Sequence, residues 1–164
     1  MSLIMGIDLG TSSTKTIIMN ESGEVIASGT SGYPMQTPAP GWVEQNTADW
    51  WHAVCASIQS ALKMLEDSSD RHTGMDILGI AVSGQMNGAV FLDQAREPLG
   101  PAILWLDGRS QAECDWANDR AGDLLSRHAM TVLNPINTLA KILWYKKNKA
   151  AEYNQSSAVL VLKD

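Results

Sequence analysis

Apolar residues recur along the chain with two periods, one typical of strands and one typical of helices. Short apolar or β-branched runs bounded by turn residues predict strands at residues 4–9, 15–19, 24–28, 77–82, 89–92, 102–105 and 158–162. Apolar positions that recur every three or four residues predict helices at residues 48–66, 111–127 and 139–149. Strands that alternate with helices in this order indicate an α/β domain with a mixed sheet.

The same pattern predicts how three of these elements pack. With Thr47 as its N-cap, the first helix would turn one apolar stripe toward the sheet: Trp51, Val54, Cys55, Ile58, Leu62 and Leu65. The nearly uninterrupted apolar run at residues 77–82 is typical of a strand buried on both faces. Ser110 and Glu113 have the spacing of a capping box, so the second helix should begin beside Ser110.

The composition supports a packed domain and restricts the classes of partner that the protein could bind. Of the 164 residues, 45% are hydrophobic and 18% are charged, which is enough apolar material for a core. The net charge of −6 argues against nucleic acid, because binding a phosphate backbone requires clustered lysine and arginine. No stretch approaches the ~18 apolar residues of a membrane span, and the N-terminus lacks the pattern of a signal peptide. We therefore expect a cytoplasmic protein without nucleic-acid or membrane partners.

The segment from Gly6 to Lys15 carries the most specific chemistry. Asp8 lies at the end of the first predicted strand, and Gly10 is followed by four hydroxyl residues. Successive backbone N–H groups in a tight turn form a concavity for anions, and hydroxyl groups from Thr11, Ser12 and Ser13 would add donors. Asp8 would repel a bare polyphosphate, so a magnesium ion between the two is the natural solution. The segment predicts a site for a magnesium-bound nucleotide.

Other interpretations of this loop remain open at this point. The loop has neither the Walker spacing nor the G-x-G-x-x-G spacing of dinucleotide sites. It joins two predicted strands, so no helix N-terminus contributes to it. A plain hairpin, in which glycine and serine only satisfy turn geometry and Asp8 caps the turn, explains the same residues equally well. Other segments must decide between the two interpretations.

Three further segments agree with the first loop in pointing to one family. They are Val82-Ser83-Gly84-Gln85-Met86-Asn87-Gly88, Ile103-Leu104-Trp105-Leu106-Asp107-Gly108-Arg109, and Trp42-Val43-Glu44-Gln45 ahead of Trp50-Trp51. Together with Gly6-Ile7-Asp8-Leu9-Gly10-Thr11, they closely resemble the N-terminal domain of the FGGY carbohydrate kinases, nearest to the xylulokinase branch. The resemblance covers essentially the whole chain in collinear order. Its specificity comes from the agreement of four separate motifs.

The resemblance implies an actin-like ATPase fold, also called ribonuclease H-like, with a mixed sheet flanked by helices. It implies that residues 1–164 are only the N-terminal portion of a sugar kinase, truncated before this domain ends and without the C-terminal domain. The implied function of the full-length protein is ATP-dependent phosphorylation of a sugar hydroxyl, with D-xylulose as the first choice of substrate, and a homodimer is an open option. Because the family's general base lies beyond the position of Asp164, we expect these residues alone to be inactive as a kinase.

The resemblance also implies roles for individual residues. Asp8 would hold Mg²⁺ through its water molecules as the catalytic carboxylate, and the ATP phosphates would contact Gly10, Thr11, Ser12, Ser13 and Lys15. For Lys15, a solvated strand lysine is an equally good interpretation. The sugar would contact Met86, Asn87, Trp105 and Asp107. Two structural alternatives stand beside these roles: Trp105 as a core residue, and Arg109 as the partner that shapes the Asp107 carboxylate.

The sequence departs from the family at two positions of the expected sugar pocket. Asn87 stands where the family usually has histidine, and Leu106 stands where it usually has asparagine. An amide still donates and accepts hydrogen bonds, but it does not titrate near neutral pH as histidine does. The sugar therefore stays open among D-xylulose, another ketose, a pentitol and a related sugar acid. An actin-like or Hsp70-like ATPase without sugar specificity and a non-catalytic sugar-binding remnant are the alternative functions.

Overall fold

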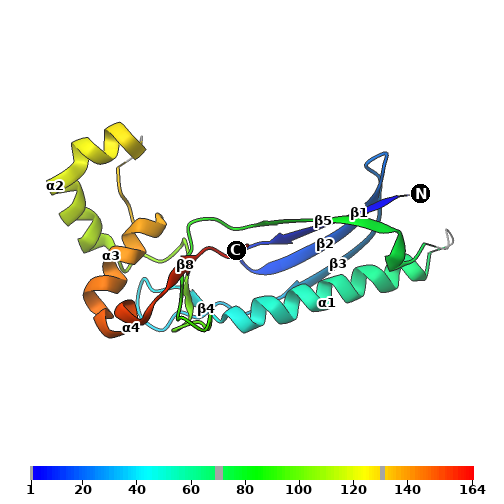
Figure 1. Ribbon diagram of the computed structural model, residues 1–164, viewed down its shortest axis with the longest axis horizontal. Coiled ribbons are helices and arrows are strands. Elements are labelled where there is room, and N and C mark those ends of the chain that lie inside the picture. Colours follow the sequence, from blue (N-terminus) through cyan, green and yellow to red (C-terminus); the bar gives the residue numbers. More distant parts are fainter. Residues whose placement is uncertain (1, 69–71, 130–131) are drawn as a thin grey trace. The chain divides into compact units, whose positions relative to one another are not determined.

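The computed structural model describes residues 2–68, 72–129 and 132–164 (Figure 1). Its strands are β1 (Leu3–Leu9), β2 (Ser13–Asn20), β3 (Val25–Gly32), β4 (Glu44–Gln45), β5 (Ile77–Gly84), β6 (Val90–Leu92), β7 (Ala102–Ile103) and β8 (Ala158–Leu160). Its helices are α1 (Thr47–Glu66), the short 3₁₀ helix η1 (Gly74–Asp76), α2 (Gln111–Ala129), α3 (Thr138–Asn148) and α4 (Ala150–Gln155). The chain divides into two compact units, which we call unit 1 and unit 2.

Unit 1 is a mixed four-stranded sheet with one long helix along it. It comprises the residues up to Pro34, Thr47–Gln85 and Lys163. The strand order is β3-β2-β1-β5, in which β1 pairs antiparallel with β2 and parallel with β5, and β2 pairs antiparallel with β3. Figure 1 shows α1 running along this sheet, and it packs mainly on β3 and β2. The predicted mixed sheet is confirmed.

Small side chains let α1 lie close to the sheet. The buried residues of the helix are Trp50, Ala53, Val54, Ser57, Ala61 and Leu65. The predicted stripe was wrong about Trp51, which is 67% exposed, whereas Trp50 is 5% exposed. The Ser57 hydroxyl lies 2.7 Å from the Thr16 hydroxyl of β2, so helix and sheet also share a buried hydrogen bond. The other members of the predicted stripe are buried (Val54, Leu65) or half-buried (Cys55, Ile58, Leu62), so the stripe was right apart from Trp51.

The edge strand β5 is exposed, so the expectation of a strand buried on both faces was wrong. Leu78, Ile80 and Val82 are 75%, 64% and 51% exposed. In the sheet, β5 pairs with β1 along one edge, and α1 covers the opposite side of the sheet around β2 and β3. An apolar strand is buried on both faces only where other layers cover it, and none of the described residues forms such a layer over β5.

Unit 2 combines two short antiparallel sheets with helices α2, α3 and α4. It comprises Met35–Asn46, Met86–Leu162 and Asp164, and its sheets pair β4 with β7 and β6 with β8. Its core contains the stacked rings of Phe91 and Tyr145, whose centroids lie 3.7 Å apart. Neither β4 nor α4 was predicted, because the first lies in a proline-rich segment and the second follows directly on α3.

The predicted capping box at the start of α2 was wrong. The helix does begin after Ser110, whose carbonyl accepts a hydrogen bond from Cys114 N at 3.0 Å. Glu113 Oε1, however, accepts from Lys147 Nζ of α3 at 3.0 Å instead of closing the box. Ser110 Oγ and Glu113 Oε2 are buried without a hydrogen-bond partner among the described residues, so neither half of the box forms.

Gly29→Ala should destabilise the protein by about 3 kcal/mol, because overpacking displaces whole elements. A Cβ at Gly29 would lie 2.1 Å from Ser57 O and 2.8 Å from Ala61 N, which belong to the α1 backbone. Urea unfolding followed by circular dichroism measures the change. Gly79→Ala in β5 is the matched control, since a Cβ there meets nothing within 4 Å. Equal losses in the two variants would contradict the close helix–sheet contact.

Candidate functional site

The bend between β1 and β2 is closed by its own backbone and held by two side chains. Gly10 N donates to Ser13 O at 2.9 Å. The Gly10 carbonyl accepts from the Tyr33 hydroxyl at 2.5 Å and from Gln85 Nε2 at 3.2 Å. Burial and, secondly, the negative charge of Asp8 raise the pKa of Tyr33 to about 12, so its hydroxyl remains a donor at neutral pH. The carbonyl is thereby engaged by the protein itself.

Asp8 and Lys15 lie opposite each other in the β1–β2 ladder, and both are exposed. Ser83 of β5 is the ladder neighbour of Asp8 on its other side. These three residues border a cavity of about 350 Å³ whose lining includes Gly6 and Ala81. The surface of this hollow is mostly apolar, so the three polar residues border it without making it a polar site. Asp8 and Lys15 nevertheless place the two kinds of charge side by side that a ligand with a metal ion and phosphate would require.

Among the predicted phosphate ligands, Thr11 and Ser13 are half-buried and Ser12 is exposed. The next hydroxyl residue, Thr14, is buried, and its Oγ1 donates to the Asp8 carbonyl at 3.0 Å. The structure thus brings Asp8, the bend and Lys15 into one part of unit 1. Of the four consecutive hydroxyl residues, Thr14 therefore has a structural role, and the other three lie at the bend.

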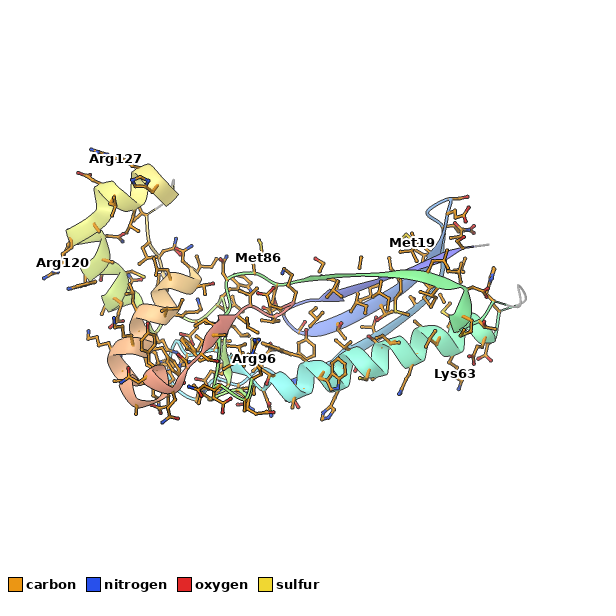
Figure 2. The ribbon with its side chains drawn as sticks, in the orientation of Figure 1. Met19, Lys63, Met86, Arg96, Arg120 and Arg127 are labelled. Carbon is orange, nitrogen blue, oxygen red and sulfur yellow. The ribbon has the colours of Figure 1, made fainter. Side chains whose placement is uncertain are left out.

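Two of the predicted sugar ligands, Met86 and Asn87, follow immediately on Gln85 and belong to unit 2. Met86 is 73% exposed, and its side chain projects away from the ribbon (Figure 2). Asn87 has a φ of 63°, in the left-handed region that asparagine and histidine enter more readily than most residues. Asparagine therefore fits this backbone conformation, as the histidine expected from the family resemblance also would.

The third candidate, Asp107, is 1% exposed, and both of its carboxylate oxygens are occupied. Oδ1 accepts from Arg109 N and Arg109 Nε, each at 2.9 Å. Oδ2 accepts from Val43 N at 2.6 Å and from Arg109 Nη2 at 2.7 Å. A sugar hydroxyl would have to displace one of these donors, so the geometry favours the alternative in which Arg109 shapes the carboxylate. The remaining candidate, Trp105, is half-buried.

Arg109 joins separate segments of unit 2. Its Nη2 also lies 2.7 Å from Glu44 Oε1, and its side chain is only 3% exposed. The guanidinium carbon lies 3.7 Å from the Trp42 ring centroid and 5.0 Å from that of Trp144. Two carboxylates and two aromatic rings therefore replace water around this charge. The motif residues Trp42, Glu44 and Asp107 meet because they all contact Arg109.

Comparison with known proteins identifies the family. The model of the FGGY family of carbohydrate kinases, N-terminal domain, matches residues 3–164. The chain belongs to this family.

Xylulose kinases are among its most similar relatives. The enzyme from Klebsiella pneumoniae is 40% identical over 164 residues, which cover 99% of this chain and 32% of that protein. The one from Escherichia coli K12 is 37% identical over 163 residues, with the same coverage. The crystal structure of a xyloylose kinase from Brucella ovis matches with a TM-score of 0.87 and 31% identity, covering 99% of this chain and 33% of that one. The FGGY chain thus has the actin-like ATPase fold and spans about a third of the length of these relatives.

A metal ion beside the bend of this FGGY chain would depend on Asp8 and on the ligand itself. Within residues 2–68, 72–129 and 132–164, no group of three or more His, Cys, Asp or Glu side chains could hold a metal ion. Mg²⁺ commonly uses one or two carboxylates together with water and substrate phosphates, and the donors at the bend fit that mode.

Each helix among the described residues is too short or too polar to span a membrane.

Lys141 in α3 is a buried cation that the sequence pattern did not indicate. It is fully buried, and its Nζ donates to Pro135 O at 2.6 Å and to Ile136 O at 3.1 Å. Burial lowers the pKa of Lys141 to about 8, although the nearby Asp107 charge acts in the opposite direction. The sequence feature that could have indicated the burial of Lys141 is its position among the apolar residues of this helix.

Arg109→Met should destabilise the protein by about 3 to 5 kcal/mol, because it leaves the Asp107 and Glu44 carboxylates buried without a cation. Urea unfolding followed by tryptophan fluorescence measures this loss. Arg127→Met in the exposed last turn of α2 (Figure 2) is the control, with an expected change within about 0.5 kcal/mol. If both variants unfold at the same urea concentration, the buried network does not hold unit 2 together.

Lys141 should make stability depend on pH between about 8 and 10.5. Its folded pKa is about 8 and its ordinary value is 10.5. Between these values the unfolded chain binds more protons than the folded chain, so this contribution to the free energy of unfolding rises with pH. The difference in that free energy between wild type and Lys141→Met should increase from pH 8 to pH 10 in urea titrations. The exposed Lys146→Met serves as control; a difference for Lys141→Met as flat as for this control would refute the shift.

Proposed function

We propose that this chain is the N-terminal domain of a cytoplasmic sugar kinase that phosphorylates D-xylulose with MgATP to give xylulose 5-phosphate. The observation that carries the proposal is the hydroxyl-bearing bend beside Asp8, in a chain of the FGGY family. Its similarity to xylulose kinases supports the choice of sugar.

The proposed nucleotide contacts belong to unit 1. Asp8 holds Mg²⁺ through water, and the bend from Gly10 to Ser13 binds the phosphates with backbone and hydroxyl donors. Lys15, exposed beside Asp8, adds positive charge to the same ligand. Magnesium, when bound, neutralises charge that develops on the transferring phosphoryl group.

The proposed sugar contacts belong to unit 2. Met86 and Asn87 contact the sugar, where the Asn87 amide donates and accepts hydrogen bonds without titrating. Trp105 packs on its apolar face. Asp107 acts by fixing the segment around it, since its carboxylate already accepts from Val43 and Arg109.

Phosphoryl transfer requires two faces of a cleft that position both reactants. The relatives are about three times as long as this chain. We therefore assign the general base and the second nucleotide-binding face to residues outside this chain, in the full-length protein. A homodimer of that protein stays an open option.

The test is a coupled assay of ADP release by the full-length protein with D-xylulose, other ketoses, a pentitol and a sugar acid. D-xylulose should give the highest kcat/KM. Asp8→Asn should lower kcat by about 100-fold, because an amide lacks the charge that holds the magnesium ion. Asp119→Asn on the exposed face of α2 is the control and should leave kcat unchanged.

Other outcomes of this assay, and of calorimetry on the same protein, favour the alternative functions. ADP release that no sugar accelerates would indicate an ATPase without sugar specificity. Sugar binding in calorimetry without nucleotide binding would indicate a non-catalytic remnant. Either result overturns the proposed function.

A further inference from the structure

Each strand that flanks the β1–β2 hairpin ends in a residue that binds the bend twice. Tyr33, directly after β3, donates its backbone N–H to Ser12 O at 3.1 Å and its hydroxyl to Gly10 O at 2.5 Å. Gln85, directly after β5, donates its backbone N–H to Leu9 O at 2.8 Å and its Nε2 to Gly10 O at 3.2 Å. The two side chains converge on one acceptor, the Gly10 carbonyl.

This convergence fixes the direction of a peptide group. A trans peptide is planar, so its N–H points away from its C=O. With Gly10 O held toward Tyr33 and Gln85, the N–H of Thr11 is directed to the opposite side. Because the carbonyls of Leu9, Gly10 and Ser12 all accept from the protein's own donors, their partial negative charges are compensated, which favours an anion at the bend.

We propose that Tyr33 and Gln85 are positioning residues of the nucleotide site, which set its affinity for MgATP through the Gly10 carbonyl. The inference rests on the proposed function in one respect, namely that the bend binds phosphate. Neither residue is assigned a contact with the nucleotide or the sugar. Both act by fixing the orientation of the Gly10–Thr11 peptide group and by compensating the charge of its carbonyl oxygen.

The hydrogen bonding of the Gln85 amide shows that its nitrogen, and not its oxygen, holds the bend. Its Nε2 is engaged by Gly10 O, whereas its Oε1 is buried without a hydrogen-bond partner among the described residues. Glutamine is therefore held here as a donor. Gln85→Met removes the donor at similar length, and Gln85→Glu in addition places a carboxylate oxygen against the carbonyl, so the glutamate variant should be the more severely impaired.

The experiment compares Tyr33→Phe, Gln85→Met, Gln85→Glu and the Tyr33→Phe/Gln85→Met double variant in the full-length protein. Each single variant should raise the KM for MgATP, and the Kd of MgADP in calorimetry, by about fivefold, the worth of one hydrogen bond. The KM for the sugar should stay within about twofold. The double variant should exceed the product of the single effects, because Gly10 O then loses both side-chain donors.

Two conservative variants serve as matched controls. Tyr153→Phe in α4 and Gln59→Met on the exposed face of α1 remove the same groups elsewhere and should leave both KM values unchanged. Melting temperatures identify any variant that has lost its fold. If a Gln85 variant fails to fold, Tyr33→Phe alone tests the positioning role, because it removes a single oxygen atom.

The outcomes separate this inference from the proposed function. Unchanged MgATP and MgADP affinity in Tyr33→Phe and in the double variant overturns the positioning role while the kinase activity stands. Loss of nucleotide and sugar affinity in equal proportion also overturns it, because it indicates a general structural defect. Absence of nucleotide binding in the wild type refutes the proposed function, and the inference with it.

Discussion

The hydrogen bonds to the Gly10 carbonyl are central to the proposed nucleotide site, because a bend that is to bind an anion must have its own carbonyl oxygens compensated. In this chain the donors come from both flanks of the β1–β2 hairpin. The strand order β3-β2-β1-β5 is what makes that possible, because it brings the ends of β3 and β5 to either side of the same bend. Tyr33 and Gln85 lie at those ends. Sheet topology and local hydrogen bonding are therefore linked through one carbonyl group, and under the proposal so is the affinity for the nucleotide.

Each unit has its own means of holding its chemistry in place. In unit 1, α1 approaches β3 so closely that only glycine fits at position 29. In unit 2, the buried Arg109 guanidinium bridges Glu44 and Asp107 and stacks on Trp42. Such a buried ionic group costs desolvation, and it is retained where several segments must be joined in one arrangement. The family motifs around Trp42 and Asp107 are better explained by this architecture than by direct contact with a ligand.

Asn87, one of the proposed sugar contacts, lies in an uncommon backbone conformation. Its φ is positive, which restricts the residue types that fit there without strain. Asparagine fits this conformation and offers both hydrogen-bond donors and an acceptor, and unlike histidine it does not titrate near neutral pH. If Asn87 contacts the sugar as proposed, recognition at this position should not follow the protonation of its side chain.

The amino-acid sequence alone specifies most strands and helices, the mixed sheet and the family, because periodicity and short motifs are local properties. Other features depend on tertiary packing. Trp50 rather than Trp51 is buried at the start of α1, and β5 is exposed because none of the described residues covers it. Glu113 pairs with Lys147, Asp107 accepts from Arg109 and Val43, and Lys141 is buried with a lowered pKa. These partners are distant in sequence or depend on the depth of burial, so no local pattern specifies them.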